Sequence, residues 1–372
     1  MSLFLPLPAQ NRSDNPFDSV FGNTVASYKF YWFLALLDIA AEDKPRDVGL
    51  CEMAARMIAK AWPARAYFRL GFGSQDRLGL TIDELCEDNP DAWTPSGVHI
   101  SAKALPEDVL QTLVANFSSK GLRVLLRQLI QKVPYRFLMP WIRDTNDASM
   151  MRRSQSFEND CLYAIVYAQK DRALRLNPRY RAYLQGNAQV LRDYTYWNLA
   201  HYFHVRNPGV PGILEKMTSV PTRESLNDER RLWTRIMRAQ GPVRCIYTGL
   251  DLQDFALDHF MPYRLVAHNE LWNLIPALPQ VNSSKSDGLP DLNHYLPDYA
   301  KTHQKALKTC LSASWGKPLV ESYECLGEDP RSIVSAEPEA LLETYKKLFV
   351  PLSQTGQKHG FVAWDYMPLR LE

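Results

Sequence analysis

The chain has 372 residues, a length that favours two domains and leaves three open. Apolar residues make up 46% of the sequence and charged residues 23%, as is usual for a soluble globular protein. A formal net charge of +2 argues against a basic nucleic-acid coat protein. It does not exclude a nucleic-acid enzyme, because only one face of such an enzyme has to be positive.

Six scattered cysteines form no Cys-x-x-Cys pair, which argues against a zinc ribbon and against a dense disulfide framework. The N-terminal stretch 1–10 contains two prolines and no Lys or Arg, unlike a signal peptide. The apolar run 30–37 is too short to span a bilayer. We therefore expect a reduced, cytoplasmic protein with no membrane partner.

The first 240 residues predict a mostly helical domain. From Asn23 onward, aromatic and aliphatic residues recur at spacings of three and four, which indicates a buried helix. Thr81 and Glu84 have the spacing of a capping box and predict a helix start there. The range 162–167 fits either a short strand or a buried helix, and 211–222 resembles a linker. Further helices are predicted at 50–61, 106–131, 188–205 and 223–239.

Arginines concentrate in three stretches of this region. Each group is either a solvated helix face or a surface that contacts phosphate. The groups are Arg123, Arg127, Arg136 and Arg143; Arg172, Arg175, Arg179 and Arg181; and Arg223, Arg230, Arg231, Arg235 and Arg238.

The segment 241–290 has a different pattern. Residues 243–247 are β-forming, and Thr248-Gly249 predicts a turn. Residues 255–259 predict a short strand, and 274–278 predict its partner across a loop. A small helix is expected to start at Asn282. The remaining residues, 291–372, predict helices at 295–311 and 337–352 that pack back on the segment.

This segment also carries the clearest chemical signal. Asp258-His259 is followed fourteen residues later by Asn273, and nine residues after that by Asn282. An imidazole side chain is the usual proton acceptor near neutral pH, so His259 can take a proton from water. Asp258 offers an anionic oxygen ligand and Asn282 a neutral one, a set that suits Mg²⁺ or Mn²⁺ beside a phosphodiester.

The residue pattern resembles the HNH nuclease module, the ββα-metal fold, and the tail Asn282-x-x-Lys285-Ser286-Asp287 is similar to the end of many such modules. RNA-guided effector nucleases carry a module of the same family. The whole chain resembles bacterial stand-alone HNH endonucleases with a helical N-terminal region. Cys245 stands where many of these modules have a first zinc cysteine, but Thr248 replaces the second, so we expect a module without structural zinc.

The resemblance implies roles for five residues. His259 would be the general base, Asp258 and Asn282 the metal ligands, and Asn273 a residue that binds the loop backbone and holds the histidine. Lys285 would contact a phosphate. Each has a structural alternative: a turn acid, a core histidine, a cap or turn asparagine, a helix cap and a solvated lysine, respectively. His268 is expected to be a loop residue.

These observations predict a mainly α protein with a small α+β HNH module toward its C-terminal half. Its domains would be a helical region at 1–240, the module at 241–290 and C-terminal helices at 291–372. The expected function is metal-dependent cleavage of DNA, in bacterial defence or restriction, with RNA left open as substrate. Two alternatives remain: a nuclease subunit of a larger RNA-guided or effector complex, and a nucleic-acid-binding subunit with an inactive module. A homodimer or a partner protein is compatible with each.

Overall fold

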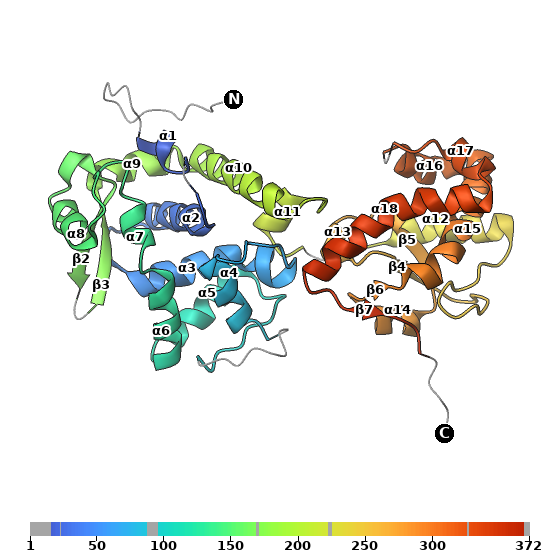
Figure 1. Ribbon diagram of the computed structural model, residues 1–372, viewed down its shortest axis with the longest axis horizontal. Helices are drawn as coiled ribbons and strands as arrows, with labels where there is room; N and C mark the ends of the chain where they lie inside the picture. The colour runs from blue at the N-terminus through green and yellow to red at the C-terminus, as the bar shows by residue number, and fades with distance from the viewer. Residues whose placement is uncertain are drawn as a thin grey trace. The chain divides into compact units, whose positions relative to one another are not determined.

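The computed structural model describes residues 16–22, 24–87, 96–168, 171–221, 225–325 and 327–367 (Figure 1). These residues form two compact units. One unit contains the described residues up to Asn207 together with Ile213–Val220, and the other contains Pro208–Gly212 and the described residues from Pro221 onward. The chain is mainly helical with a small α+β module toward its C-terminal half, so the predicted fold class is confirmed.

Helix α2 (Tyr28–Ala41) is the centre of the first unit. Every residue from Phe30 to Leu37 is buried, because helices cover it on more than one side. It packs against α3 (Leu50–Trp62) and α10 (Ala188–Arg206) and lies between them in Figure 1. The other helices of this unit are α1 (Pro16–Ser19), η1 (Pro63–Tyr67), α4 (Arg77–Leu85), α5 (Pro106–Ala115), α6 (Lys120–Leu129), α7 (Val133–Arg136), α8 (Asp147–Gln155), η2 (Glu158–Asp160), α9 (Pro178–Gly186) and α11 (Ile213–Thr218).

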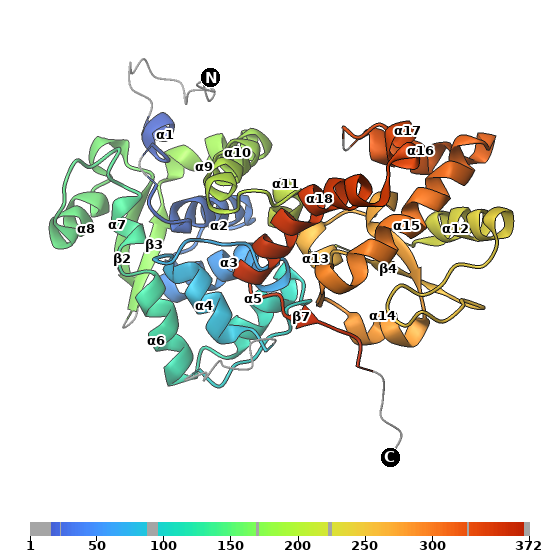
Figure 2. The same cartoon turned by 45° about the vertical axis from the view of Figure 1, so that its right-hand side comes forward.

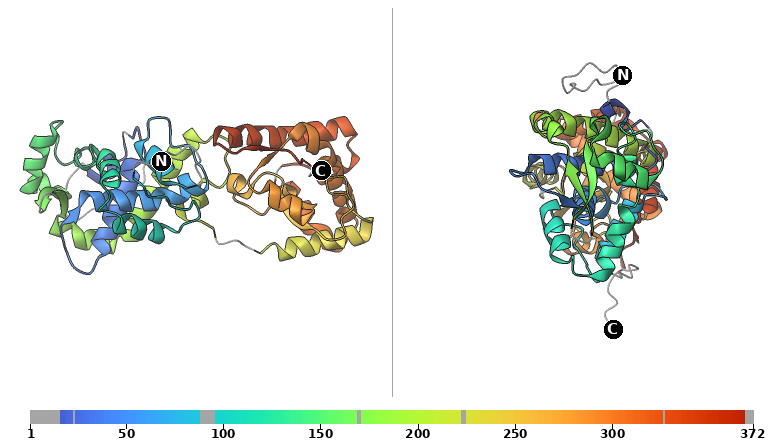
Figure 3. Two further views of the ribbon diagram at one scale, coloured as in Figure 1. Left: turned by 90° about the horizontal axis from the view of Figure 1, so that it is seen from below. Right: turned by 90° about the vertical axis from the view of Figure 1, so that its left-hand side faces the viewer.

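A three-stranded antiparallel sheet completes the first unit. Its strands are β1 (Val48–Gly49), β2 (Tyr163–Ala168) and β3 (Asp171–Leu176), in the order β1-β3-β2. The green strands β2 and β3 face the viewer in the right-hand view of Figure 3. The sequence at 162–167 fitted either a strand or a helix. It forms strand β2, because the backbone of β2 pairs with β3 along its whole length.

Two local predictions in the first unit are wrong. Helix α4 starts after Asp76, whose carboxylate accepts hydrogen bonds from the N–H groups of Leu78 and Gly79, and Thr81 is buried within the helix. Because Asp76 caps the first N–H groups of α4, the helix begins there and not at Thr81. The stretch 211–222 is not only a linker, since α11 lies within it and buries Ile213 and Met217.

The second unit is built around α15 (Leu292–Leu311), which packs against α12 (Asn227–Gln240), α16 (Lys317–Glu324), α17 (Pro330–Ser335) and α18 (Pro338–Lys358). Figure 2 shows α16 and α17 at the top of this unit and α14 at its lower edge. A helix was predicted at 223–239, and α12 covers all but the first residues of this range. Residues 222–224 lie outside the described part of the chain. Thus α12 belongs to the same unit as the predicted nuclease segment.

A small hairpin carries the predicted chemistry. Strands β4 (Ala256–His259) and β5 (Leu274–Ala277) pair antiparallel, and α14 (Pro279–Lys285) follows directly. Between the strands lie α13 (Tyr263–Val266) and η3 (Leu271–Asn273). Asn282 is therefore in the middle of α14, whereas the sequence pattern predicted it at the helix start.

The C-terminal segment closes onto this hairpin and helix. Strand β6 (Leu289–Pro290) pairs in parallel with β7 (Ala363–Trp364). Gly288 allows the close approach, because a Cβ atom there would lie 2.6 Å from Cβ of Trp364. Residues beyond the predicted module thus cover one side of it.

Candidate functional site

The two central residues, Asp258 and His259, are the last two of strand β4. Successive strand residues point to opposite faces, so their side chains occupy different surroundings. Asp258 is 2% exposed, whereas His259 is half-buried. The pairing of Asp258 with Ile275 and of His259 with Leu274 holds this end of the strand.

Both carboxylate oxygens of Asp258 accept hydrogen bonds. The Tyr247 hydroxyl donates to Oδ2 at 2.5 Å, and the Lys285 ammonium donates to Oδ1 at 3.0 Å. Burial, and next the charge of Asp258, raise the pKa of Tyr247 well above its usual value. The phenol therefore stays protonated and remains a donor to the carboxylate.

Lys285 connects α14 to strand β4. Its ammonium donates a second hydrogen bond, at 2.7 Å, to the backbone carbonyl of His259. The side chain is fully buried, so its charge is balanced by Asp258 within the protein. A solvated lysine, the structural alternative, is therefore excluded, and one of the three N–H donors remains for another acceptor.

Asn282 lies one helical turn before Lys285 on α14 and so shares the face that meets β4. Its side chain is partly exposed, and it makes no hydrogen bond to any residue that the structure describes. The amide oxygen is thus not engaged by any described residue, on a helix that contacts the strand of Asp258.

Asn273 binds the backbone of the turn that follows His259. Its side-chain oxygen accepts from the N–H of Met261 at 2.8 Å, and its side-chain nitrogen donates to the Met261 carbonyl at 2.9 Å. Asn273 is completely buried, and its own carbonyl accepts from Phe260. These bonds fix the chain immediately after the histidine.

Asn269 is a site residue that the sequence pattern did not indicate. Its Oδ1 lies 3.0 Å from Nε2 of His259. The intervening chain turns back at Ala267, which ends α13 in the left-handed conformation with φ of 58°. Neighbouring His268 packs its ring against Trp272, with centroids 5.0 Å apart. Only the folded loop reveals which member of the His268-Asn269 pair reaches His259.

Tyr247 was also missed, since it lies among β-forming residues that suggest only local structure. Residues 243–252 form a tight turn, in which the N–H of Cys245 donates to the Leu250 carbonyl and that of Leu252 to the Val243 carbonyl. This turn brings Tyr247 to Asp258. At the other end of the site, Arg264 of α13 is buried and pairs with Asp287 at 2.9 Å.

The donor set fits a hard divalent cation. Each oxygen of Asp258 has two lone pairs, and the two described hydrogen bonds leave room for coordination. Asn282 adds a neutral oxygen, and Mg²⁺ commonly takes one or two protein ligands and completes its shell with water and phosphate. Among the described residues, no cluster of three or more His, Cys, Asp or Glu side chains offers a fuller cage.

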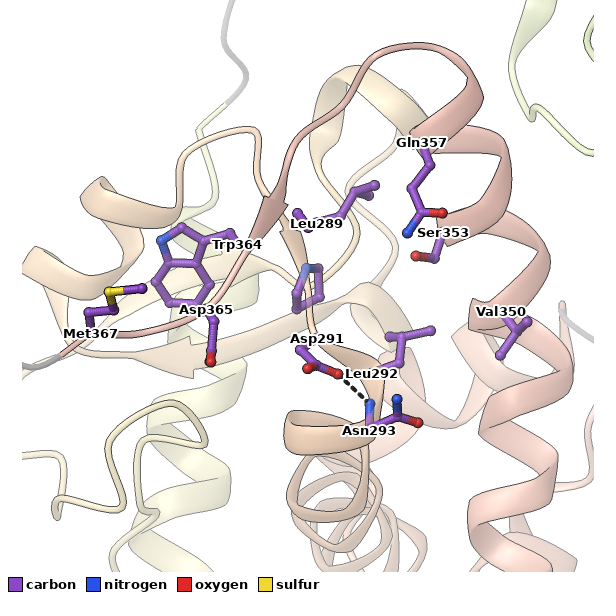
Figure 4. A pocket seen from close by; sticks show the side chains of 12 residues that line it. Leu289, Asp291, Leu292, Asn293, Val350, Ser353, Gln357, Trp364, Asp365 and Met367 are labelled. Carbon is purple, nitrogen blue, oxygen red and sulfur yellow. Dashed lines mark hydrogen bonds between the residues drawn. The ribbon is translucent and has the colours of Figure 1, made fainter.

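A separate cavity of about 670 Å³ lies beside strands β6 and β7 (Figure 4). Trp364 forms one wall and packs edge-on against Tyr247, with ring centroids 5.1 Å apart. Asp291 and Asp365 line the cavity together with apolar and amide side chains, and no Lys or Arg is among the lining residues. This chemistry does not suit a phosphate group, so the cavity is not the place for the scissile bond.

Comparison with known families agrees with the geometry. Residues 245–291 match the family model of HNH endonucleases. No curated protein and no solved structure matches the chain. Among the described residues, none of the helices combines the length and apolar composition needed to cross a bilayer. The matched segment spans the tight turn, the hairpin and α14, and we conclude that residues 245–291 of this chain are an HNH nuclease domain of the HNH endonuclease family.

Proposed function

We propose that the protein is a metal-dependent endonuclease that hydrolyses phosphodiester bonds in DNA. The observation that supports the proposal is the placement of three groups on adjoining elements, strand β4 and helix α14. The carboxylate of Asp258 and the imidazole of His259 come from β4, and the open amide of Asn282 comes from α14. These are an oxygen ligand pair and a base, as hydrolysis requires.

His259 acts as the general base in this proposal. Nε2 of its ring lies 3.0 Å from Oδ1 of Asn269, a contact that orients the imidazole. The imidazole takes the proton of a water molecule, the water oxygen forms a bond to phosphorus, and the P–O bond to the leaving oxygen breaks. The leaving oxygen then takes a proton from solvent. Asn273 holds the backbone after His259 and so keeps the ring in place.

Asp258 and Asn282 would hold Mg²⁺ or Mn²⁺. When bound, such an ion supplies charge that offsets the phosphate oxygens and the leaving oxygen. Lys285 balances Asp258 and uses two of its N–H groups on the protein. A contact of Lys285 with a phosphate oxygen stays a prediction, since the side chain is fully buried and its ammonium already donates two hydrogen bonds within the protein.

A role in bacterial restriction or defence is part of the proposal and rests on the resemblance of the sequence to stand-alone enzymes. DNA is the proposed substrate, and RNA is the alternative. A comparison of cleavage of the two nucleic acids decides between them. Incubation of one preparation with labelled duplex DNA and duplex RNA of the same sequence distinguishes the two.

Metal binding tests the proposed ligands without relying on activity. Titration of Mn²⁺, followed by electron paramagnetic resonance, is expected to show a bound ion whose affinity falls at least ten-fold in Asn282→Ala, because that substitution removes the neutral oxygen. Ser284→Ala changes an exposed residue of the same helix and serves as the matched control. Equal affinity in wild type and Asn282→Ala would remove Asn282 from the ligand set.

A further inference from the structure

The C-terminal segment 361–366 is connected to the candidate metal site, although it lies outside the family match at 245–291. The indole of Trp364 packs edge-on against the ring of Tyr247, with ring centroids 5.1 Å apart and an angle of 89° between the ring planes. The hydroxyl of Tyr247 in turn donates to Oδ2 of Asp258. One ring contact and one hydrogen bond therefore connect this segment to a proposed metal ligand.

The ring of Tyr247 is held by two aromatic neighbours. Tyr295 of α15 packs against it with centroids 4.9 Å apart and an angle of 74°, and Trp364 is the second neighbour. Tyr295 and Trp364 also contact each other, with centroids 6.1 Å apart, so the three rings form one cluster. Edge-to-face packing is a preferred arrangement of aromatic rings, and here it restricts how the phenol of Tyr247 can tilt. A ring restricted in this way directs its hydroxyl at one oxygen of Asp258.

Backbone hydrogen bonds fix Trp364 in place. The N–H of Leu289 donates to the carbonyl of Val362 at 2.9 Å, and the N–H of Asp291 donates to the carbonyl of Trp364 at 3.3 Å. These bonds accompany the parallel pairing of β6 with β7, where Figure 4 shows Trp364 beside Leu289 and Asp291. Strand β6 follows α14 after a short turn, so the indole is tied to the module that carries the proposed ligands.

Tyr295 anchors the residues that follow Trp364. Its hydroxyl donates to the carboxylate of Asp365 and accepts from the N–H of Tyr366 at 2.8 Å. The ring of Tyr295 also packs on Tyr247. One residue of α15 therefore holds both the C-terminal segment and the phenol that this segment contacts.

We propose that Trp364 is a positioning residue of the metal site and acts through Tyr247 on the carboxylate of Asp258. The proposal rests on the proposed nuclease function, in which Asp258 is a metal ligand. A carboxylate whose hydrogen-bond partner is held in place needs less reorientation when the cation binds, and loss of such a partner commonly weakens metal affinity by about ten- to a hundred-fold. The C-terminal segment is then a working part of the nuclease module, in addition to covering one side of it.

Core packing is the alternative role of this aromatic cluster. Packing alone would lower the melting temperature of a variant but would leave the Mn²⁺ affinity of the folded protein unchanged. A metal titration therefore separates the two roles when every protein is measured well below its melting temperature.

The test titrates Mn²⁺ into the full chain and follows the free ion by electron paramagnetic resonance. Tyr247→Phe removes the hydroxyl, Trp364→Ala removes the indole, and Trp364→Phe retains an aromatic ring at that position. The double variant Tyr247→Phe/Trp364→Ala measures whether the two residues act together. Val362→Ala changes a side chain of the same segment that is 73% exposed, and it is the matched control.

We expect Tyr247→Phe to weaken the affinity for Mn²⁺ by about ten-fold, and Trp364→Ala to weaken it by roughly three- to ten-fold. Trp364→Phe and the control should stay within about two-fold of wild type, because neither removes the ring contact. In the Tyr247→Phe background, Trp364→Ala should add less than about two-fold, since the hydroxyl through which the indole acts is already absent.

Wild-type affinity in Trp364→Ala would overturn the proposal. So would an equal loss of affinity in the two backgrounds, or a loss in Trp364→Phe as large as that in Trp364→Ala. If a folded wild type binds no Mn²⁺, the assignment of Asp258 as a ligand fails, and this proposal fails with it. Metal-dependent cleavage by wild type, together with unchanged Mn²⁺ affinity in Trp364→Ala, overturns the positioning role alone.

Discussion

Asn269 links the geometry of the site to the rate of the proposed reaction. Its carbonyl oxygen lies within hydrogen-bond distance of Nε2 of His259 and so orients the ring of the proposed base. Sequence spacing did not indicate this residue, since it lies ten positions after the histidine in a loop. Only the fold brings Asn269 to the proposed base.

Replacement of Asn269 by alanine is expected to lower the cleavage rate by roughly ten- to a hundred-fold, because the ring loses its orienting acceptor. Single-turnover kinetics measure the rate, and ¹⁵N NMR of the imidazole reports the tautomer. Asn269→Asp retains an acceptor and should preserve the Nε2–H tautomer. A wild-type rate in Asn269→Ala, together with an unchanged tautomer, would show that this residue does not position the base.

The pair formed by Asp258 and Lys285 is nearly inaccessible to solvent, with exposed side-chain fractions of 3% and 0%. Lys285→Met would leave a buried carboxylate without its counter-charge, so we expect the free energy of unfolding of the second unit to fall by about 3–5 kcal/mol. Chemical denaturation without added metal measures the change. The double variant Asp258→Asn/Lys285→Met should recover much of the stability, and failure to recover would show that the charge pair is not the cause of the decrease.

At the scale of elements, the hairpin and α14 depend on neighbours that lie outside the family match. Phe260 of the turn after β4 packs on Tyr299 of α15, with ring centroids 4.2 Å apart, and on Phe349 of α18 at 5.0 Å. The Tyr299 hydroxyl also donates to the carbonyl of Trp272. A two-stranded hairpin is marginal alone, so these helices supply the packing that stabilises it.

His303 of α15 makes that helical packing sensitive to acid. The ring is completely buried, its Nδ1 lies 2.8 Å from the Tyr323 hydroxyl, and burial lowers its pKa to about 3. The unfolded chain takes up this proton below about pH 6.5, whereas the folded protein resists it until about pH 3. Protonation thus favours the unfolded state, and stability falls as the pH drops between these values.

We expect this histidine to reduce the free energy of unfolding by about 3 kcal/mol between pH 7 and pH 4. His303→Phe removes the titrating group and should flatten the dependence over this range, even if the absolute stability is lower. Urea denaturation at several pH values, followed by tryptophan fluorescence, provides the comparison. An equally steep decline in the variant would mean that other groups cause the acid sensitivity.

At the scale of the whole molecule, local patterns predicted the elements more completely than the contacts of the site. The strands around Asp258 and Ile275 and the helix at 295–311 are present because β-forming runs and helical periodicity act over short distances. Helix α11 was hidden in a stretch bounded by Pro and Gly, and it is only six residues long. The start of α4 was misplaced because two nearby residues are both suitable caps.

Sequence spacing could predict only those candidate site residues that lie at fixed distances from one another along the chain. Asp258, His259 and Asn282 lie on a hairpin strand and on the helix that directly follows the hairpin. The contacts of Tyr247, Asn269 and Lys285 depend on turns and burial, which no short pattern encodes. The sequence suggested that Lys285 contacts solvent or a substrate phosphate. In the folded protein its ammonium instead binds Asp258 and the carbonyl of His259.

The central claim is that the HNH domain of this chain cuts DNA with His259 as the base. Supercoiled plasmid incubated with Mg²⁺ or Mn²⁺ provides the direct test, with wild type and His259→Ala compared at equal concentration and equal melting temperature. We expect nicked or linear plasmid with wild type, at least a hundred-fold less product with His259→Ala, and none after removal of the metal by a chelator. Equal cleavage by the two proteins, or no cleavage by a folded wild type, would contradict the account.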